Sequence, residues 1–320
     1  MFSSMNFLFT ACLGLSTIFA LSSDNWFQIW AALEINMMMF IPLMFSKDNL
    51  SINSMMKYFI IQAFASSLFI CTMILSQSFF WESLNSDLIM LAMTVKLGLF
   101  PVYFWFPQVS EGLSWFSFTL LSTWQKIIPL YIMAASSKML MGVILASSAM
   151  IGCISMINQN SLRKIFAFSS LTHMSWMLLS MLNNNTSWFL YFIIYTMIMI
   201  SIYLIMNKIN ASTIDSIKYM FNKNQNMALI ISLMSLGGLP PFLGFLPKWM
   251  VISNTIDNMY FFMFILIISS LISIFIYLRL TYPLLFNKMM MMNKTSTFNN
   301  MNSSLINTLL LIPMVPMVMF

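Results

Sequence analysis

Apolar residues fill long, nearly unbroken stretches of this chain, and short polar segments separate them. Stretches of about 18 residues or more can cross a hydrocarbon core of roughly 30 Å as helices. A membrane β-barrel would instead show alternating polar and apolar residues. The pattern therefore predicts an all-α, polytopic membrane helix bundle, built as one transmembrane domain over residues 1–320. We place about eleven spans at residues 4–21, 26–45, 57–76, 87–107, 113–135, 139–157, 165–182, 187–206, 227–256, 260–282 and 304–320.

The ninth stretch, 227–256, is the longest and contains the sequence LGGLPPFLGFLPKW. Glycine weakens a helix, and proline breaks one because it lacks the N–H and clashes with the preceding turn. Broken helices are tolerated in membranes where protein covers the freed backbone groups or where they line a cavity. We expect a single crossing made of two half-helices here, and a short surface helix in the polar segment 207–226.

The composition agrees with a lipid environment. Of the 320 residues, 60% are hydrophobic and 7% are charged, whereas about 25% of residues are charged in a typical soluble domain. The net charge of +6 does not indicate a nucleic-acid-binding protein, because the basic residues lie in short segments between apolar stretches. The first stretch has no basic segment before it and no cleavage site with small residues after it, so we expect a spanning helix and not a removable signal.

The charges in the connecting segments differ between the two expected sides of the bundle. Segments after odd-numbered spans carry one basic residue, Lys138, and the acids Asp24, Glu82, Asp87 and Asp257. Segments after even-numbered spans carry the acids Asp48, Glu111 and Asp215 and ten basic residues, Lys47, Lys57, Arg163, Lys164, Lys208, Lys218, Lys223, Arg279, Lys288 and Lys294. The positive-inside rule then places the N-terminus on the positive side and the C-terminus on the opposite side.

Four charged residues remain inside the spans: Glu34, Lys96, Lys126 and Lys248. A charge at the centre of a membrane helix costs roughly 2.5–3.5 kcal/mol on insertion scales, so each of these residues needs a partner or a function. One interpretation is structural: salt bridges lock the helices together, and a long lysine such as Lys248 reaches an interface. The other is a proton relay, because a Lys–Glu pair whose separation changes can take up or release a proton.

His173 is the only histidine and lies in the seventh expected span, within SSLTHMSWML. An imidazole titrates near pH 6.5 when unperturbed, which suits a neutral proton shuttle. A single histidine among apolar residues can equally be a hydrogen-bonded core residue. The neighbouring hydroxyl groups of Ser169, Ser170, Thr172 and Ser175 could hold waters beside it.

The chain shows no sequence signature of a cofactor or metal site. Cys12, Cys71 and Cys153 are far apart in apolar stretches, so we expect inert buried thiols. With one histidine and no C-x-x-C pair, ligands for an iron–sulfur cluster, a haem or a zinc ion are missing. The glycine-rich phosphate-binding motifs are missing as well.

Five stretches resemble the chain 2 subunits of mitochondrial NADH–ubiquinone oxidoreductase, the respiratory complex I. These subunits belong to the antiporter-like proteins of the membrane arm. The stretches occur in the family's order, the likeness covers most of the chain, and the length and the 36 methionines fit an invertebrate form. They are LEIN (33–36), VKLGLFPVYFWFPQVSEGL (95–113), TWQKIIPL (123–130), SSLTHMSWML (169–178) and SLGGLPPFLGFLPKW (235–249).

The resemblance implies proton translocation driven by quinone reduction elsewhere in the complex. By position, Glu34 would be the charge-modulating carboxylate and Lys96 its partner. Lys126 would be the central relay group and Lys248 the far lysine. Relatives often carry histidine where this chain has Tyr103 and an acid where it has Gln108, so these two positions are not expected to handle protons.

The resemblance also implies partners and a location. NADH, FMN, iron–sulfur clusters and ubiquinone would bind in partner subunits, and this chain would hold no cofactor itself. Other membrane-arm and accessory subunits and inner-membrane lipids would surround it, with the basic segments and the N-terminus on the matrix side and the C-terminus in the intermembrane space. Two alternatives remain at this stage: a freestanding cation/proton antiporter, and a structural scaffold whose buried charges only lock helices.

Overall fold

The computed structural model describes residues 4–76, 82–136, 140–183, 186–209, 211–217, 223–255 and 259–290. These ranges are helical almost throughout and contain no strand, apart from an isolated bridge between Ser161 and Thr213. The predicted all-α class is therefore confirmed. The chain divides into two compact units, Met1–Ser148 and Ala149–Phe320, which are described separately here.

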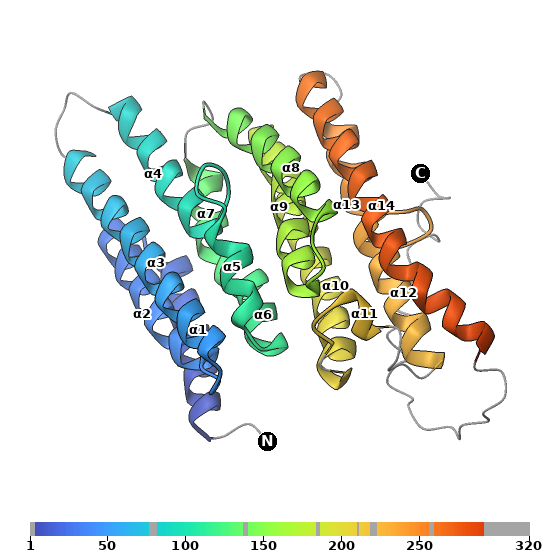
Figure 1. Ribbon diagram of the computed structural model, residues 1–320. Coiled ribbons are helices and arrows are strands. Elements are labelled where there is room, and N and C mark those ends of the chain that lie inside the picture. The colour runs from blue at the N-terminus through green and yellow to red at the C-terminus, as the bar shows by residue number, and fades with distance from the viewer. Residues whose placement is uncertain are drawn as a thin grey trace. The chain divides into compact units, whose positions relative to one another are not determined.

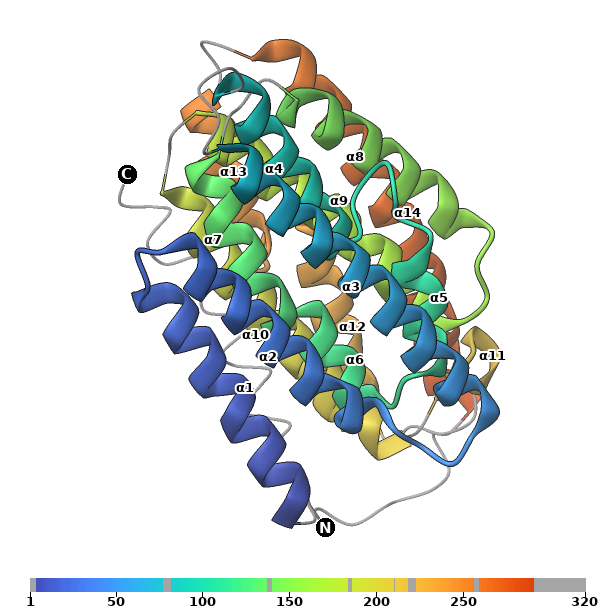
Figure 2. The same ribbon diagram turned by 90° about the vertical axis from the view of Figure 1, so that its left-hand side faces the viewer.

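The first unit is built around α3, the long helix Asn49–Ser76 (Figures 1 and 2). On one side α3 contacts α2, which in turn packs along α1, and on the other side it contacts α4 and α5. Helix α4 also contacts α7. The helices are α1 (Ser4–Ser22), α2 (Trp26–Met44), α3, α4 (Glu82–Leu97), α5 (Trp105–Gly112), α6 (Trp115–Ser122), the 3₁₀-helix η1 (Trp124–Lys126) and α7 (Ile127–Ala135). Helix α8 (Met141–Ile157) begins in this unit and ends in the second.

The second unit contains α9, a helix that is buried at every position from Ile165 to Leu182. A helix that is buried on every side over this length belongs to the interior of a bundle. Helices α10, α13 and α14 contact it, and α12 packs between α10 and α14 (Figure 1). The helices are α9 (Leu162–Leu182), α10 (Ser187–Ile209), α11 (Ile214–Ile217), α12 (Lys223–Gly237), α13 (Phe245–Thr255) and α14 (Tyr260–Met290).

Six helices, α1, α2, α3, α9, α10 and α14, are long and apolar enough to cross a membrane, and α8 and α12 are shorter apolar helices. The other expected crossings that fall within the described ranges consist of helix pieces. The break expected in the ninth span is confirmed, because α12 ends at Gly237 and α13 begins at Phe245. The short helix expected in 207–226 is α11. The eleventh expected span, 304–320, lies outside the described residues.

Several expected boundaries are wrong. Helix α3 begins at Asn49, so Lys57 lies within a helix and not in a connecting segment. The expected span 87–107 is broken: its first helix starts earlier, at Glu82, and ends at Leu97, and the chain becomes helical again at Trp105 in α5. The expected span 113–135 is interrupted at η1. Hydropathy identifies the apolar part of a helix that crosses the hydrocarbon core, whereas backbone hydrogen bonding decides where the helix begins and ends. A hydropathy pattern therefore does not reveal polar first turns or short breaks.

Helices α4 and α12 end in the same backbone motif. Gly98 and Gly238 follow the two helices with φ of 70° and 74°, a left-handed conformation that favours glycine. Gly98 N–H donates to Val95 O and Leu99 N–H to Thr94 O, at 3.1 and 3.0 Å. At the second helix end, Gly238 N–H donates to Ser235 O and Leu239 N–H donates to Met234 O. These are Schellman caps, which end each helix sharply and provide hydrogen-bond donors to some of its last carbonyl groups.

Candidate functional site

Lys96 lies in the last turn of α4, two residues before Gly98. The side chain is buried, with 7% exposed. Two side chains donate to carbonyl groups at the helix end. Gln62 Nε2 donates to Lys96 O at 3.2 Å, and Trp105 Nε1 donates at 3.1 Å to Val95 O, which also accepts from Gly98 N–H. The break after α4 is therefore covered by protein, as a broken helix in a membrane requires.

Lys126 occupies the last position of η1, between α6 and α7, and is 2% exposed. Its ammonium nitrogen lies 4.8 Å from the centre of the Phe106 ring. An aromatic face attracts a cation, and more strongly where water is excluded. Pro129 follows in the first turn of α7, where its missing N–H costs nothing because the first N–H groups of a helix have no intrahelical partner.

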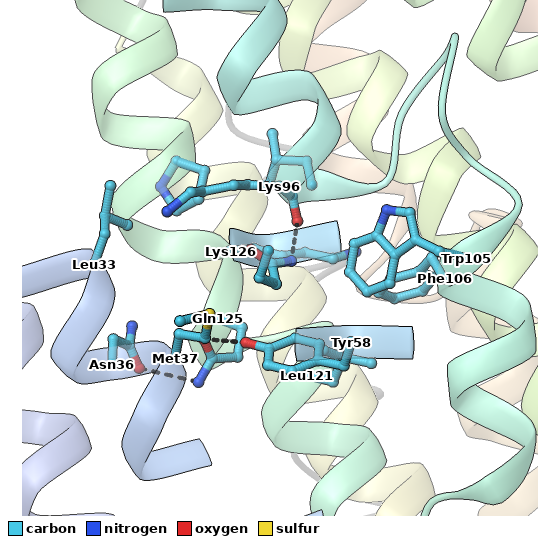
Figure 3. Close-up of a pocket in the computed structure, with 13 residues that line it drawn as sticks. Leu33, Asn36, Met37, Tyr58, Lys96, Trp105, Phe106, Leu121, Gln125 and Lys126 are labelled. Atoms are coloured by element: carbon cyan, nitrogen blue, oxygen red, sulfur yellow. Dashed lines mark hydrogen bonds between the residues drawn. The ribbon is translucent and has the colours of Figure 1, made fainter. Parts of the chain in front are cut away.

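Lys96 and Lys126 line the same small cavity in the first unit (Figure 3). The cavity has about 20 Å³ of space for water centres, which is room for one or two waters. Its wall combines these two lysines with uncharged polar side chains and apolar ones. The lining residues are Leu33, Asn36, Met37, Tyr58, Gln62, Lys96, Leu97, Trp105, Phe106, Leu121, Gln125, Lys126 and Pro129.

Glu34 belongs to α2 and does not line this cavity, although its neighbours Leu33 and Asn36 do. Its carboxylate is partly exposed and interacts electrostatically with Lys96. The structure thus brings together three of the charges that were singled out in the sequence: Glu34, Lys96 and Lys126. The carboxylate acts on the first lysine from outside the cavity that the two lysines share.

Lys248 lies in α13 of the second unit, just after the break. It is 7% exposed, and its ammonium donates to Gly237 O at 2.7 Å. Gly237 is the last residue of α12, so the cation sits at the negative end of a helix dipole. A Cβ on Gly238 would come within 2.9 Å of Lys248 Cδ and Nζ, so the glycine gives the lysine room to fold back onto the break.

His173 lies at the middle of α9, a helix that packs against α13. Its Nδ1 makes a 2.9 Å hydrogen bond with the Tyr191 hydroxyl of α10. The Tyr195 ring, one turn further along α10, lies 5.2 Å from the imidazole between ring centroids. Tyr277 of α14 interacts with Tyr191, and all three tyrosines are buried.

The hydroxyl groups next to His173 make hydrogen bonds within α9 itself. Ser169, Ser170, Thr172 and Ser175 each donate to the carbonyl oxygen three residues earlier, at 2.6–2.8 Å. Such local bonds are the usual arrangement for hydroxyl side chains inside a helix. The tyrosines are the contacts that sequence reasoning missed, although the i, i+4 spacing of Tyr191 and Tyr195 places both on one face of α10.

The two positions where relatives often carry titratable residues have other contacts here. The Tyr103 ring lies against Phe104, with 3.9 Å between centroids. Gln108 Oε1 accepts a hydrogen bond from Lys57 at 2.9 Å.

Within the described ranges, no three His, Cys, Asp or Glu side chains come together as a metal site. Of the three thiols expected to be buried, Cys153 is buried, Cys12 is partly exposed, and Cys71 is exposed, which corrects the expectation for Cys71. Cys71 lies on the spanning helix α3, where an exposed side chain can face lipid.

Comparison with known proteins identifies the family. The model of the family described as "NADH:quinone oxidoreductase/Mrp antiporter, TM" matches residues 23–273. The chain is 40% identical to NADH-ubiquinone oxidoreductase chain 2 of Anopheles gambiae, across 94% of this chain and 92% of that protein. The chain belongs to the NADH-ubiquinone oxidoreductase chain 2 family. This membership confirms the resemblance, and it favours a subunit of that enzyme over a freestanding antiporter.

Solved structures show the same fold at low sequence identity. A chain of respiratory complex I from Thermus thermophilus with bound aureothin matches with a TM-score of 0.85 and 18% identity, over 97% of this chain and 77% of that one. A chain of the Mrp complex from Dietzia sp. matches with a TM-score of 0.76 and 16% identity, over 85% of this chain and 59% of that one. The chain 2 family thus shares the antiporter-like membrane fold.

Proposed function

We propose that this chain translocates protons across the mitochondrial inner membrane as a membrane-arm subunit of respiratory complex I. Lys96 and Lys126 would carry the proton in the first unit, with Glu34 modulating Lys96. Lys248 and His173 would carry it in the second unit. The observation that supports the proposal most directly is the small polar cavity that Lys96 and Lys126 share inside an otherwise apolar bundle.

The chemistry follows from two lysines that line one small cavity. Proton exchange between them needs one ammonium and one neutral amine, because only a neutral amine can accept a proton. A proton that leaves the ammonium through a water in the cavity is accepted by the neutral amine, and no bond other than N–H and O–H changes. A carboxylate that approaches or leaves Lys96 biases which of the two lysines holds the proton.

The work must come from outside this chain. Moving one charge against the membrane potential costs about 2.3 kcal/mol per 100 mV. The chain carries no recognisable nucleotide, flavin or cluster motif, so we infer that NADH, FMN, iron–sulfur clusters and ubiquinone bind to partner subunits. The remaining contacts would be with other membrane-arm and accessory subunits and with inner-membrane lipids, and none with nucleic acid.

Replacing the lysines tests the proposal. In inner-membrane vesicles, Lys126→Met and Lys96→Met should each lower NADH-driven proton pumping about tenfold or more, because a thioether carries no proton at these positions. Lys57→Met is the matched control, since Lys57 is an exposed lysine of the same unit that bonds Gln108 outside the cavity. Normal pumping by both cavity variants would contradict the relay.

The same variants separate the relay from the structural scaffold. A scaffold lysine should reduce the amount of assembled complex, whereas a relay lysine should leave assembly intact and remove pumping. Native gels stained for NADH dehydrogenase activity, with mass spectrometry of the stained band, measure assembly. If the wild-type chain migrates alone, outside any band that oxidises NADH, the assignment to complex I fails and proton flux in vesicles would test the antiporter.

A further inference from the structure

Three uncharged side chains form a hydrogen-bonded bridge in the wall of the lysine cavity (Figure 3). Gln125 Nε2 donates to Asn36 Oδ1 at 3.0 Å, and the Tyr58 hydroxyl donates to Gln125 Oε1 at 3.4 Å. The Gln125 amide therefore uses its nitrogen and its oxygen on partners from two different helices. Two such partners fix the direction in which the amide points.

The bridge joins α2, which carries Glu34, to η1, which carries Lys126. Asn36 lies on α2, two residues after Glu34, and is 2% exposed. Gln125 lies in η1, immediately before Lys126. The bridge is thus the direct hydrogen bond between the helix that bears the carboxylate and the turn that bears the second lysine.

The turn that carries Lys126 needs this support because its own backbone holds it weakly. A 3₁₀ segment has poorer hydrogen-bond geometry than an α-helix, and within a longer helix it often marks a hinge. Thr123, where the turn begins, has φ of −116° and ψ of −72°, and Lys126 N–H donates to Thr123 O at 3.2 Å.

We propose that Gln125 is a positioning residue, which through Asn36 and Tyr58 holds η1 against α2 and so keeps Lys126 at the cavity. A displacement of α2 that moves Glu34 relative to Lys96 would then also move Lys126 through the same bridge. The bridge has no titratable group of its own in the physiological range, so it sets geometry and does not carry the proton. This inference rests on the relay proposed above.

Breaking the bridge in the assembled complex tests the inference. Gln125→Met removes both of its hydrogen bonds and nearly keeps its volume, and Asn36→Leu removes the acceptor. Each should lower NADH-driven pumping about fivefold to tenfold, because each breaks the 3.0 Å bond between Gln125 and Asn36 that joins η1 to α2. Tyr58→Phe removes only the hydroxyl and keeps the ring contacts with Phe40 and Trp105, so it should fold and lower pumping about twofold.

A double exchange distinguishes positioning from packing. Asn36→Gln combined with Gln125→Asn keeps both amide groups and the total side-chain length across the bridge. The double exchange should restore at least about half of the pumping that Asn36→Gln or Gln125→Asn loses alone. Gln28→Leu is the control, because Gln28 is an exposed amide on the same helix α2. It should pump normally.

Three outcomes overturn the inference. The single variants pump normally per assembled complex, the double exchange is no better than its components, or Gln28→Leu loses as much as Gln125→Met. Lys126→Met, measured alongside, separates this failure from failure of the relay. If Lys126→Met abolishes pumping and Gln125→Met does not, only the bridge is wrong; if Lys126→Met pumps normally, the relay itself is wrong.

Discussion

At the scale of single residues, His173 offers the sharpest contrast between a core residue and a proton carrier. The 2.9 Å bond between its Nδ1 and the Tyr191 hydroxyl fixes the ring orientation and leaves Nε2 as the other exchanging position. Tyr195 contacts the same imidazole through its ring, which is tilted by 41° with centroids 5.2 Å apart. The two tyrosines therefore touch one imidazole in different ways.

This difference gives a prediction. Tyr191→Phe removes the hydroxyl bonded to Nδ1 and frees the ring to turn, so pumping should fall about threefold to tenfold, the effect of losing one buried hydrogen bond. It should also shift the pH at which pumping is half-maximal, because the tautomer is no longer fixed. Pumping measured between pH 6 and 8.5 in vesicles checks both. Equal pumping and an unchanged pH profile would assign His173 to the core.

The residues that the sequence could and could not reveal differ in one physical respect. Glu34, Lys96 and Lys126 were predictable because a charge inside an apolar stretch is costly and stands out. Asn36 and Gln125 were not, since an amide in a membrane helix has no such cost signal. Their pairing depends on which turn of α2 faces η1, and this is a property of tertiary packing alone.

At the scale of elements, the capped ends of α4 and α12 decide where the lysines go. The break in the ninth span could be predicted because its glycines and prolines exclude a continuous helix. The helix end at Leu97 was less visible, since one glycine and one proline in VKLGLFPVYF permit either a kink or a stop. The cap hydrogen bonds around Gly98 make it a stop.

Two adjacent glycines at the end of α12 provide a matched test of this cap. Gly238 has φ of 74°, and a Cβ there would meet Lys248, whereas a Cβ on Gly237 would make ordinary contacts of 3.4–3.5 Å with Ile274 and Tyr277. Gly238→Ala should therefore destabilise the unit by about 1–3 kcal/mol and displace Lys248 from Gly237 O. Gly237→Ala should have little effect.

Thermal inactivation of NADH-driven pumping measures the difference between the two variants. Gly238→Ala should lose activity at a lower temperature than wild type and pump more slowly even before heating, because Lys248 has moved. If both alanine variants behave like wild type, the cap does not position Lys248, and if both fail equally, the left-handed φ is not the cause.

At the scale of the whole molecule, the distribution of charge predicts which face of the membrane each connecting segment meets. The basic residues follow even-numbered crossings, and this holds only if each broken stretch counts as one crossing. The helix pieces α12 and α13 are compatible with one crossing, because only the short segment from Gly238 to Gly244 separates them. Counting them as two crossings would move Arg279 to the acidic side.

Labelling from each side of the membrane tests the topology. Asp24, between α1 and α2, and Ser212, just before α11, are both exposed. With the N-terminus in the matrix, Asp24→Cys should react with an impermeant maleimide in mitoplasts with intact inner membranes, and Ser212→Cys only in inverted vesicles. The unsubstituted chain, with its three native cysteines, gives the background in both preparations. Our count places seven crossings between the two positions, and an odd number puts them on opposite sides. Labelling of both positions from one side would therefore mean that an even number of crossings separates them, and the relay residues would then have to be reassigned to new depths.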